Sequence, residues 1–123
     1  MTDADRKQVH EALTRAQSGT SARIGVRIIP DAEVDAYERA VKEFETANLH
    51  THEHRNAVLI LVAPNAKRYA VIGDSALHAR VGDAFWNDAV ARMRPHFISG
   101  DIPGALIDVI DFVGKALHEH FSQ

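Results

Sequence analysis

The sequence contains no cysteine in its 123 residues, so disulfides, thiol nucleophiles, zinc ribbons and iron–sulfur sites are excluded. It has no run of lysine and arginine, and its formal net charge is −3, so we expect no nucleic-acid partner. The longest apolar run, 57–63, is too short to span a bilayer, and no apolar stretch follows the N-terminal charges. We therefore expect a soluble, cytoplasmic protein without a secretory signal or a membrane span.

The short motifs of common nucleotide-binding and hydrolytic sites are missing as well. There is no Gly-x-Gly-x-x-Gly, no P-loop, no Gly-x-Ser-x-Gly and no His-Glu-x-x-His. The sequence does contain a balanced composition, in which 46% of the residues are apolar and 25% are charged. A chain of this length buries roughly two-thirds of its unfolded surface when it folds. We expect one domain over residues 1–123.

Hydrophobic periodicity predicts helices that alternate with a few strands. Two helices are expected at 3–17 and 31–47. The second should bury the stripe Val34, Tyr37, Val41 and Phe44. A third helix is expected between Gly82 and Gly100, and a last one begins after its cap, Asp101. The expected strands are 22–29, 57–62 and 69–72, and a short helical turn is expected at 76–80. This order predicts an α/β fold: a compact three-layer α/β/α sandwich with four main helices and a small mixed sheet of one parallel pair and a β-hairpin.

The predicted topology brings three loops together at one rim of the sheet. Counting outward from the turn at Pro64 places Asn56 opposite Asp74, and the first strand starts at the same edge. The side chains expected at this rim are Thr20, Ser21, His50, His52, His54, Arg55, Asn56, Asp74, Ser75 and His78. If the protein has a site, we expect it there.

Two of these residues are candidate catalytic groups. The planar guanidinium of Arg55 could hold a phosphate or a carboxylate, and Asp74 could bind a cation or act as a nucleophile. Ser75 could contribute a hydroxyl group. The alternative is structural: Asp74 caps a helical turn, Ser75 forms the turn, and Arg55 is a solvated charge or the partner of a nearby carboxylate.

The segment His50-Thr-His52-Glu-His54 is spaced like a metal motif. In an extended segment the three imidazoles point to one side, and Asp74 or His78 could supply a remote ligand. Such a site would take a divalent metal ion. The alternative is a flexible polar loop with no cofactor.

Several spaced motifs resemble those of TPM domains, in particular the short bacterial members without a membrane segment. The motifs lie at 19–24, 55–62, 68–74, 77–86 and 94–101, and the final helix continues the match. The resemblance implies a small α/β/α sandwich. It also implies a varied chemistry, because some long members are described as acid phosphatases, some bind calcium or other divalent ions through acidic loops, and some serve in photosystem repair.

The sequence departs from the family pattern at two positions where long members have a carboxylate. Arg55 stands where an Asp commonly precedes the second strand, and Arg23 replaces the Glu that enters the first. Both changes remove negative charge from the rim, and a hard cation needs several oxygen ligands. We therefore favour a non-catalytic binding or scaffold module, stress- or envelope-related, with an unknown protein or small-molecule partner. The alternative is a weak acid phosphatase that depends on a divalent metal.

Overall fold

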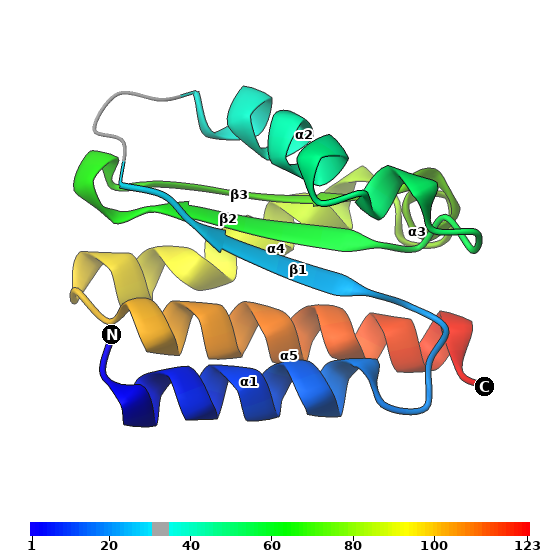
Figure 1. Ribbon diagram of the computed structural model, residues 1–123, viewed down its shortest axis with the longest axis horizontal. Helices are drawn as coiled ribbons and strands as arrows, with labels where there is room; N and C mark the ends of the chain where they lie inside the picture. Colours follow the sequence, from blue (N-terminus) through cyan, green and yellow to red (C-terminus); the bar gives the residue numbers. More distant parts are fainter. Residues whose placement is uncertain (31–34) are drawn as a thin grey trace.

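A three-stranded sheet lies at the centre of the fold, with helices on both of its faces (Figure 1). The computed structural model describes residues 1–30 and 35–123. The strands are β1 (Ile24–Ile28), β2 (Val58–Ala63) and β3 (Arg68–Gly73). The helices are α1 (Asp3–Gln17), α2 (Ala36–Thr46), α3 (Ser75–Val81), α4 (Asp83–Ile98) and α5 (Ile102–Phe121), with short 3-10 helices η1 (Leu49–Thr51) and η2 (Pro64–Ala66).

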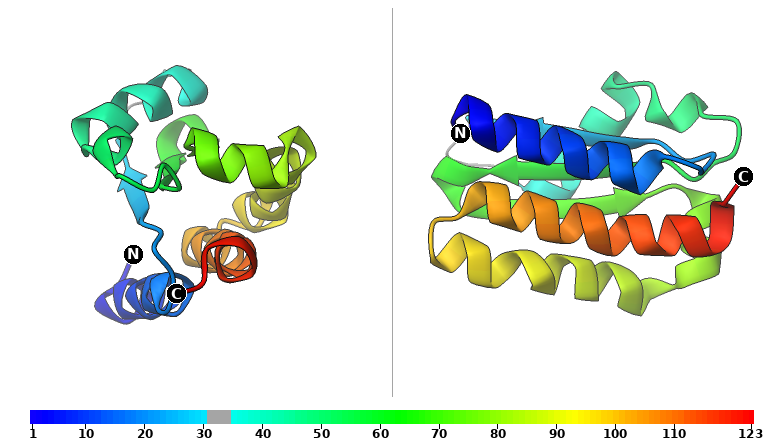
Figure 2. Two further views of the ribbon diagram at one scale, coloured as in Figure 1. Left: turned by 90° about the vertical axis from the view of Figure 1, so that its right-hand side faces the viewer. Right: turned by 90° about the horizontal axis from the view of Figure 1, so that it is seen from below.

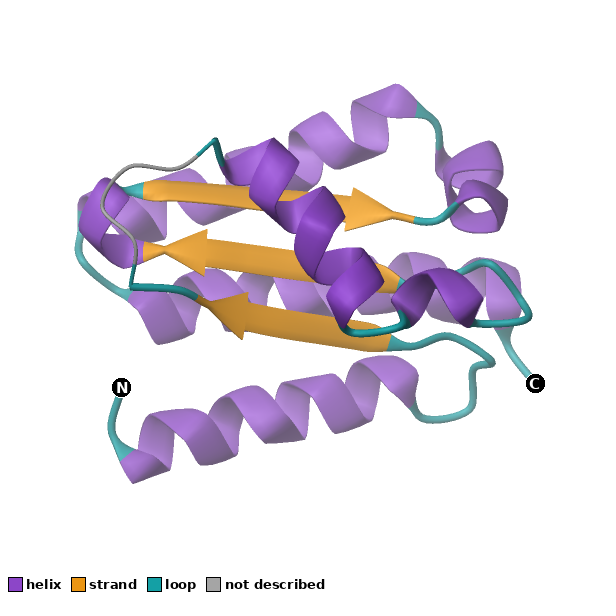
Figure 3. Cartoon of the chain, turned by 45° about the horizontal axis from the view of Figure 1, so that its top comes forward, coloured by secondary structure: helices purple, strands orange, loops and turns teal. Residues whose placement is uncertain are grey.

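The strand order is β1-β2-β3, and the pairing is mixed as the sequence predicts. β1 runs parallel to β2, with Ile24 opposite Val58, and β3 runs antiparallel to β2, with Gly73 opposite Val58. Figure 3 shows β2 between its two neighbours, with β3 outermost on one side. All six residues of β2 are buried, which explains its continuous apolar run.

Alternate residues of β2 enter two separate cores, one on each face of the sheet. Ile60 packs with apolar residues of α1, α4 and α5, whereas Leu59 and Leu61 pack with α2. Figure 2 shows α1, α4 and α5 side by side on one face. The α/β class and the small mixed sheet are therefore confirmed. None of the helices that the structure describes is long and apolar enough to cross a membrane.

Polar caps set the ends of the helices where the sequence places them. Thr2 and Asp5 form a reciprocal capping box at the start of α1, with nitrogen–oxygen distances of 2.9 and 3.0 Å. The hydrogen bonds from Thr2 hold the pKa of Asp5 below its ordinary value. Asp101 caps α5 by accepting a hydrogen bond of 2.9 Å from Gly104 N.

Two expectations about the helices are wrong. The described residues form five α-helices rather than four, because the turn expected at 76–80 is a complete helix, α3. In α2, Tyr37 and Val41 are 66% and 40% exposed, while Ala40 and Phe44 are buried. The buried face of α2 combines Phe44, which the stripe includes, with alanines, which the stripe leaves out. The expected cap Asp31 and the expected stripe residue Val34 lie outside the described residues.

Candidate functional site at the sheet rim

Three loops converge at one rim of the sheet, as the topology predicts. The register aligns Ile24, Val58 and Gly73, so the segments before β1, before β2 and after β3 lie at the same edge. The detailed pairing differs by one residue from the prediction: Ala57, not Asn56, lies opposite Asp74, whose backbone N donates to Ala57 O at 2.9 Å.

Asp74 occupies the junction between β3 and α3 and serves as the cap of α3. Its Oδ1 accepts a hydrogen bond of 2.7 Å from Ser75 N, and its Oδ2 lies 3.4 Å from Arg55 Nε. The Asp74 side chain is only 11% exposed, whereas that of Arg55 is 56% exposed. The carboxylate is therefore held from both sides, with its charge balanced by the guanidinium.

The backbone of Arg55 has the left-handed conformation, with φ of 54°. Its N–H donates to His52 O at 3.0 Å and its carbonyl accepts from Ala76 N at 2.9 Å. The side chain also donates to His50 O at 3.2 Å. These contacts join the loop before β2 to the start of α3 and fix the guanidinium beside Asp74.

Asn56 is fully buried and links the segment before β2 to the segment before β1. Its amide Nδ2 donates to Ser21 Oγ at 2.9 Å. Its Oδ1 receives no hydrogen bond from any described residue, and neither does Asp74 Oδ2, since the Arg55 contact has ion-pair distance without hydrogen-bond alignment. Buried polar atoms are normally satisfied, so two unsatisfied acceptor oxygens at one rim mark a place for a donor. We call Ser21, Asn56 and Asp74 the rim cluster.

The loop before β1 is held by hydrogen bonds to the main chain of Ser21 from two other segments. His52 Nε2 lies 2.7 Å from Ser21 O, and Ser21 N donates to Phe121 O at 3.2 Å. Thr20 is buried, but its hydroxyl donates to Gln17 O at 2.8 Å, so this side chain closes the end of α1. Of the two residues predicted in this loop, Ser21 belongs to the rim cluster and Thr20 does not.

The histidine segment does not adopt the extended shape that its metal motif requires. His50 lies in the 3-10 helix η1, and the chain turns again after His52. His54 pairs with Glu53 at 3.3 Å, and its ring centroid lies 5.6 Å from that of His52. Across residues 1–30 and 35–123, no three histidine, aspartate or glutamate side chains are grouped to hold a metal ion. A bound metal stays a prediction.

The last two predicted rim residues belong to α3 and have different surroundings. Ser75 is exposed at the first position of the helix. His78 is engaged by α4: its Nδ1 accepts a hydrogen bond of 3.0 Å from Trp86 Nε1, and its Nε2 lies 3.4 Å from Asp83 Oδ1. The imidazole therefore belongs to a second surface.

Comparison with known proteins identifies the family. The model of the TPM domain matches residues 1–116. The chain belongs to the TPM domain family. Comparison with curated proteins finds no match. Among solved structures, the BA42 protein from the psychrophilic bacterium Bizionia argentinensis is 29% identical, with a TM-score of 0.89 over 99% of this chain and 84% of that one.

Two more distant structures share the fold of this TPM domain. The N-terminal domain of a protein from P. gingivalis is 18% identical, with a TM-score of 0.83 over 100% of this chain and 82% of that one. The N-terminal domain of the cg2496 protein from Corynebacterium glutamicum is 15% identical, with a TM-score of 0.75 over 95% of this chain and 74% of that one. These likenesses establish the architecture and carry no information about activity.

The arrangement at the rim limits the chemistry that this TPM domain can perform there. A carboxylate nucleophile has to leave its own contacts before it attacks a substrate, and Asp74 is engaged by both Ser75 and Arg55. A calcium site needs six to eight oxygens, and the described cluster offers two without a hydrogen-bond donor, one of which is ion-paired with Arg55. The oxygens of Asn56 and Asp74 that have no hydrogen-bond donor are suited to accept hydrogen bonds.

One polar site was not predicted from the sequence. Trp86 is half-buried against the core, and its indole N–H donates a hydrogen bond to His78 Nδ1. The close approach of its ring to Gly73, where a Cβ atom would collide with it, fixes this position. The glycine at the end of β3 was the signal that a large side chain lies against the strand.

Proposed function

We propose that this TPM domain is a non-catalytic binding module whose rim cluster accepts hydrogen bonds from a small ligand or a partner group. The observation that carries the proposal is the pair of buried, unsatisfied oxygens, Asn56 Oδ1 and Asp74 Oδ2. Burial without a donor costs about 1–3 kcal/mol for an oxygen such as Asn56 Oδ1, and less for Asp74 Oδ2 because the Arg55 guanidinium lies 3.4 Å away. A ligand with N–H or O–H groups removes this cost, and binding is favoured accordingly.

The charge of the rim supports the same proposal. Asp74 and Arg55 neutralise each other, so the cluster attracts neither a strongly anionic nor a divalent cationic ligand. Ser21 already accepts from Asn56, and its hydroxyl hydrogen is free to complete the contact with a ligand. A stress- or envelope-related role and a cytoplasmic location stay predictions, since no contact among the described residues bears on them.

A weak phosphatase is the second candidate, because a carboxylate and a guanidinium lie 3.4 Å apart at a loop junction. In that mechanism Arg55 would hold the phosphoryl group and Asp74 would attack it, with a divalent ion bound by histidines of the rim. The cap contact with Ser75 would have to break first. We regard this requirement as the reason to favour the binding module.

The decisive experiment compares hydrolysis of p-nitrophenyl phosphate by the wild type, Asp74→Ala and Asp88→Ala at acidic and neutral pH, with and without Mg²⁺, Mn²⁺, Ca²⁺ or Zn²⁺. Asp88 is an exposed carboxylate of α4 and serves as the matched control. We expect no turnover that depends on Asp74. Metal-dependent turnover that is lost in Asp74→Ala and kept in Asp88→Ala would replace the binding module by the phosphatase.

Binding is tested by NMR titration of the wild type with methylguanidinium and with N-methylacetamide, two small hydrogen-bond donors. We expect amides of 20–23, 55–57 and 73–76 to shift together and saturably, and to stop responding in Asp74→Asn. Ca²⁺ should leave the wild type unchanged but perturb Arg55→Asp, in which the carboxylate of long family members is restored. A wild type that responds to Ca²⁺ and to neither donor contradicts the proposal.

A further inference from the structure

The outer edge of β3 carries backbone groups that no strand of the described sheet pairs. Along an antiparallel strand, residues that bond to the neighbouring strand alternate with residues whose N–H and C=O groups point away from it. The hydrogen bond from Asp74 N to Ala57 O shows which residues of β3 face β2. Ile72 and Ala70 therefore bond to β2, whereas the N–H and C=O groups of Tyr69, Val71 and Gly73 point outward. β3 is the last strand of the sheet on this side, so the outward groups have no strand partner.

The opposite edge of the sheet is protected by a charged side chain. By the same alternation Val26 points outward from β1, and its carbonyl accepts a hydrogen bond of 3.1 Å from Arg27 Nη1. The guanidinium of Arg27 also lies 3.8 Å from Glu43 of α2. A charged residue folded over an edge is a common protection against strand addition. No described side chain bonds to the outward groups of β3.

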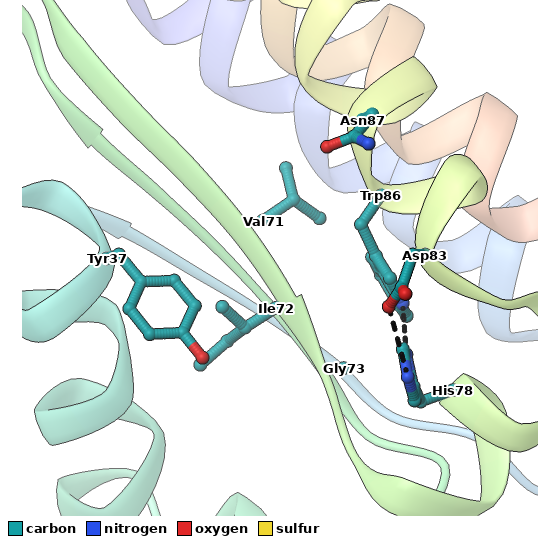
Figure 4. A pocket seen from close by; sticks show the side chains of 8 residues that line it. All are labelled: Tyr37, Val71, Ile72, Gly73, His78, Asp83, Trp86 and Asn87. Atoms are coloured by element: carbon teal, nitrogen blue, oxygen red, sulfur yellow. Dashed lines mark hydrogen bonds and ion pairs between the residues drawn. The ribbon is translucent and has the colours of Figure 1, made fainter.

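A depression of about 360 Å³ lies beside the end of β3, between α2 and α4. Figure 4 shows Tyr37 on one side, Trp86 and Asn87 on the other, and the strand itself between them. Trp86 is fixed by its hydrogen bond to His78, so this wall is preorganised. Tyr37 is 66% exposed although it is aromatic, which is typical of a binding surface.

A second depression, of about 370 Å³, lies at the start of β3 and is basic. α4 passes along the whole strand, because Trp86 lies against Gly73 and Phe97 stacks on Tyr69 with centroids 4.4 Å apart. Lys67 and Arg94 line this depression together with Ile98, which is 78% exposed. Lys67, Arg68 and Arg94 have no carboxylate partner among the described residues. The β3–α4 groove, defined by the two depressions, thus has the aromatic Trp86 and the acidic Asp83 at one end and the cations Lys67 and Arg94 at the other.

We propose that the β3–α4 groove binds an extended acidic segment of a partner protein, which adds to the sheet as an antiparallel strand beside β3. The open backbone groups at 69, 71 and 73 supply main-chain hydrogen bonds. In the antiparallel direction the N-terminal half of the segment places an apolar side chain against Trp86. Its C-terminal half brings carboxylates to Lys67 and Arg94, while Asp83 repels acidic residues from the other end.

A second copy of this chain fits the groove less well than a single strand. Val71 lies in the middle of the edge and is only 6% exposed, so the edge is recessed between α2 and α4. Two such edges paired face to face would bring their own helices into collision before the strands reach the spacing of about 4.8 Å that pairing needs. A lone peptide strand has no such walls. The groove includes Gly73, next to Asp74 of the rim cluster, so the amides of Ser21 and Asn56 are the ones that distinguish its test from that of the proposed function.

The test uses the full chain and the peptide acetyl-Thr-Phe-Thr-Val-Thr-Glu-Glu-amide. Trp86 is the single tryptophan, so its fluorescence reports the groove directly. We expect saturable binding, slower hydrogen exchange at the amides of Tyr69, Val71 and Gly73, and no change at Ser21 or Asn56. Peptide N-methylated at the positions that face β3 should not bind, because it cannot donate to the strand.

Reversing the charges of Lys67 and Arg94 distinguishes binding in the β3–α4 groove from non-specific binding of the peptide. The double variant Lys67→Glu, Arg94→Glu should weaken binding at least about tenfold, and a peptide with lysines in place of the glutamates should recover it. Lys7→Glu, an exposed cation of α1, is the matched control and should bind like the wild type. The proposal is overturned if no binding appears up to about 1 mM, if the N-methylated peptide binds equally, or if Lys7→Glu has the effect of the double variant. Concentration-dependent dimerisation that protects the same amides would assign the groove to a second copy instead.

Discussion

The close packing of α1 on α5 leads to a quantitative prediction for Gly114→Ala. A Cβ atom at Gly114 would lie 2.6 Å from Ala16 Cβ and 2.9 Å from Ala16 Cα, where ordinary contacts are about 3.5–4.0 Å. Neither contact atom belongs to a flexible side chain, so the two helices must move apart. Overpacking of this kind costs about 1–3 kcal/mol, against a gain of about 1 kcal/mol in helix propensity. Because both close contacts lie below 3.0 Å, the cost falls at the upper end of that range, and we expect a net loss of about 1–2 kcal/mol, or roughly 3–10 °C in Tm.

A double-mutant cycle with Ala16→Gly isolates the steric part. That variant alone should cost about 2 kcal/mol, from lost helix propensity and one buried methyl group. In the double variant the methyl group is moved from one helix to the other and the closest contact disappears. We expect the double variant to lose at most about 1 kcal/mol relative to the wild type, and therefore a coupling free energy of about 2–4 kcal/mol.

The assay is urea unfolding followed by circular dichroism and by the fluorescence of Trp86. Lys115 is the exposed neighbour of Gly114 on α5, and the difference between Lys115→Gly and Lys115→Ala measures the helix-propensity contribution at an unobstructed site. The reasoning is refuted if Gly114→Ala is as stable as the wild type or more stable, or if the stability changes in the cycle are additive.

Two further predictions concern polar contacts. Ser21→Ala should destabilise the fold by about 1–3 kcal/mol, because it leaves the buried amide of Asn56 without its acceptor; an unfolding midpoint equal to that of the wild type would contradict this. Burial alone would raise the pKa of Asp108, but hydrogen bonds from His96 and Arg92, at 3.0 and 2.7 Å, outweigh it and hold the pKa below its ordinary value. Because the pKa of Asp108 is lower in the folded state than in the unfolded chain, its ionised form stabilises the folded state at pH values above the ordinary pKa. This stabilisation is lost as the pH falls through the pKa of Asp108 in the folded state. Asp108→Asn should therefore cost about 1 kcal/mol at neutral pH and progressively less below about pH 4, and a difference that stays constant down to pH 3 would refute the assignment.

The rim could be predicted because its position depends on strand order alone. A continuous apolar strand followed by a hairpin brings Asp74 to the start of β2, whatever the side chains nearby. The error of one residue in the pairing has a local cause. The connection is a 3-10 turn over Pro64–Ala66, followed by Lys67 in the left-handed conformation with φ of 53°, so the turn holds one residue more than the counting assumed.

The individual contacts at the rim could not be predicted, because they depend on loop conformation. The spacing of His50, His52 and His54 favours a metal site only if the segment is extended, and the 3-10 turn at η1 removes that condition. The tertiary hydrogen bond between Trp86 and His78 has no counterpart in local spacing. Hydrophobic patterns with the period of a strand or a helix show which face of that element is buried. They contain no information about which polar side chains of two different elements bond to each other.

The pairing of Arg55 with Asp74 carries the proposed function. The left-handed backbone of Arg55 is held by hydrogen bonds from both sides, so the loop shape does not depend on the charge of the side chain. The charge is thus free to change while the fold is kept. With an aspartate there, two carboxylates would face each other and repel unless a cation lay between them. With arginine, Asp74 is neutralised within the chain, and in the proposed function its oxygen and that of Asn56 accept from a hydrogen-bond donor and not from a metal ion.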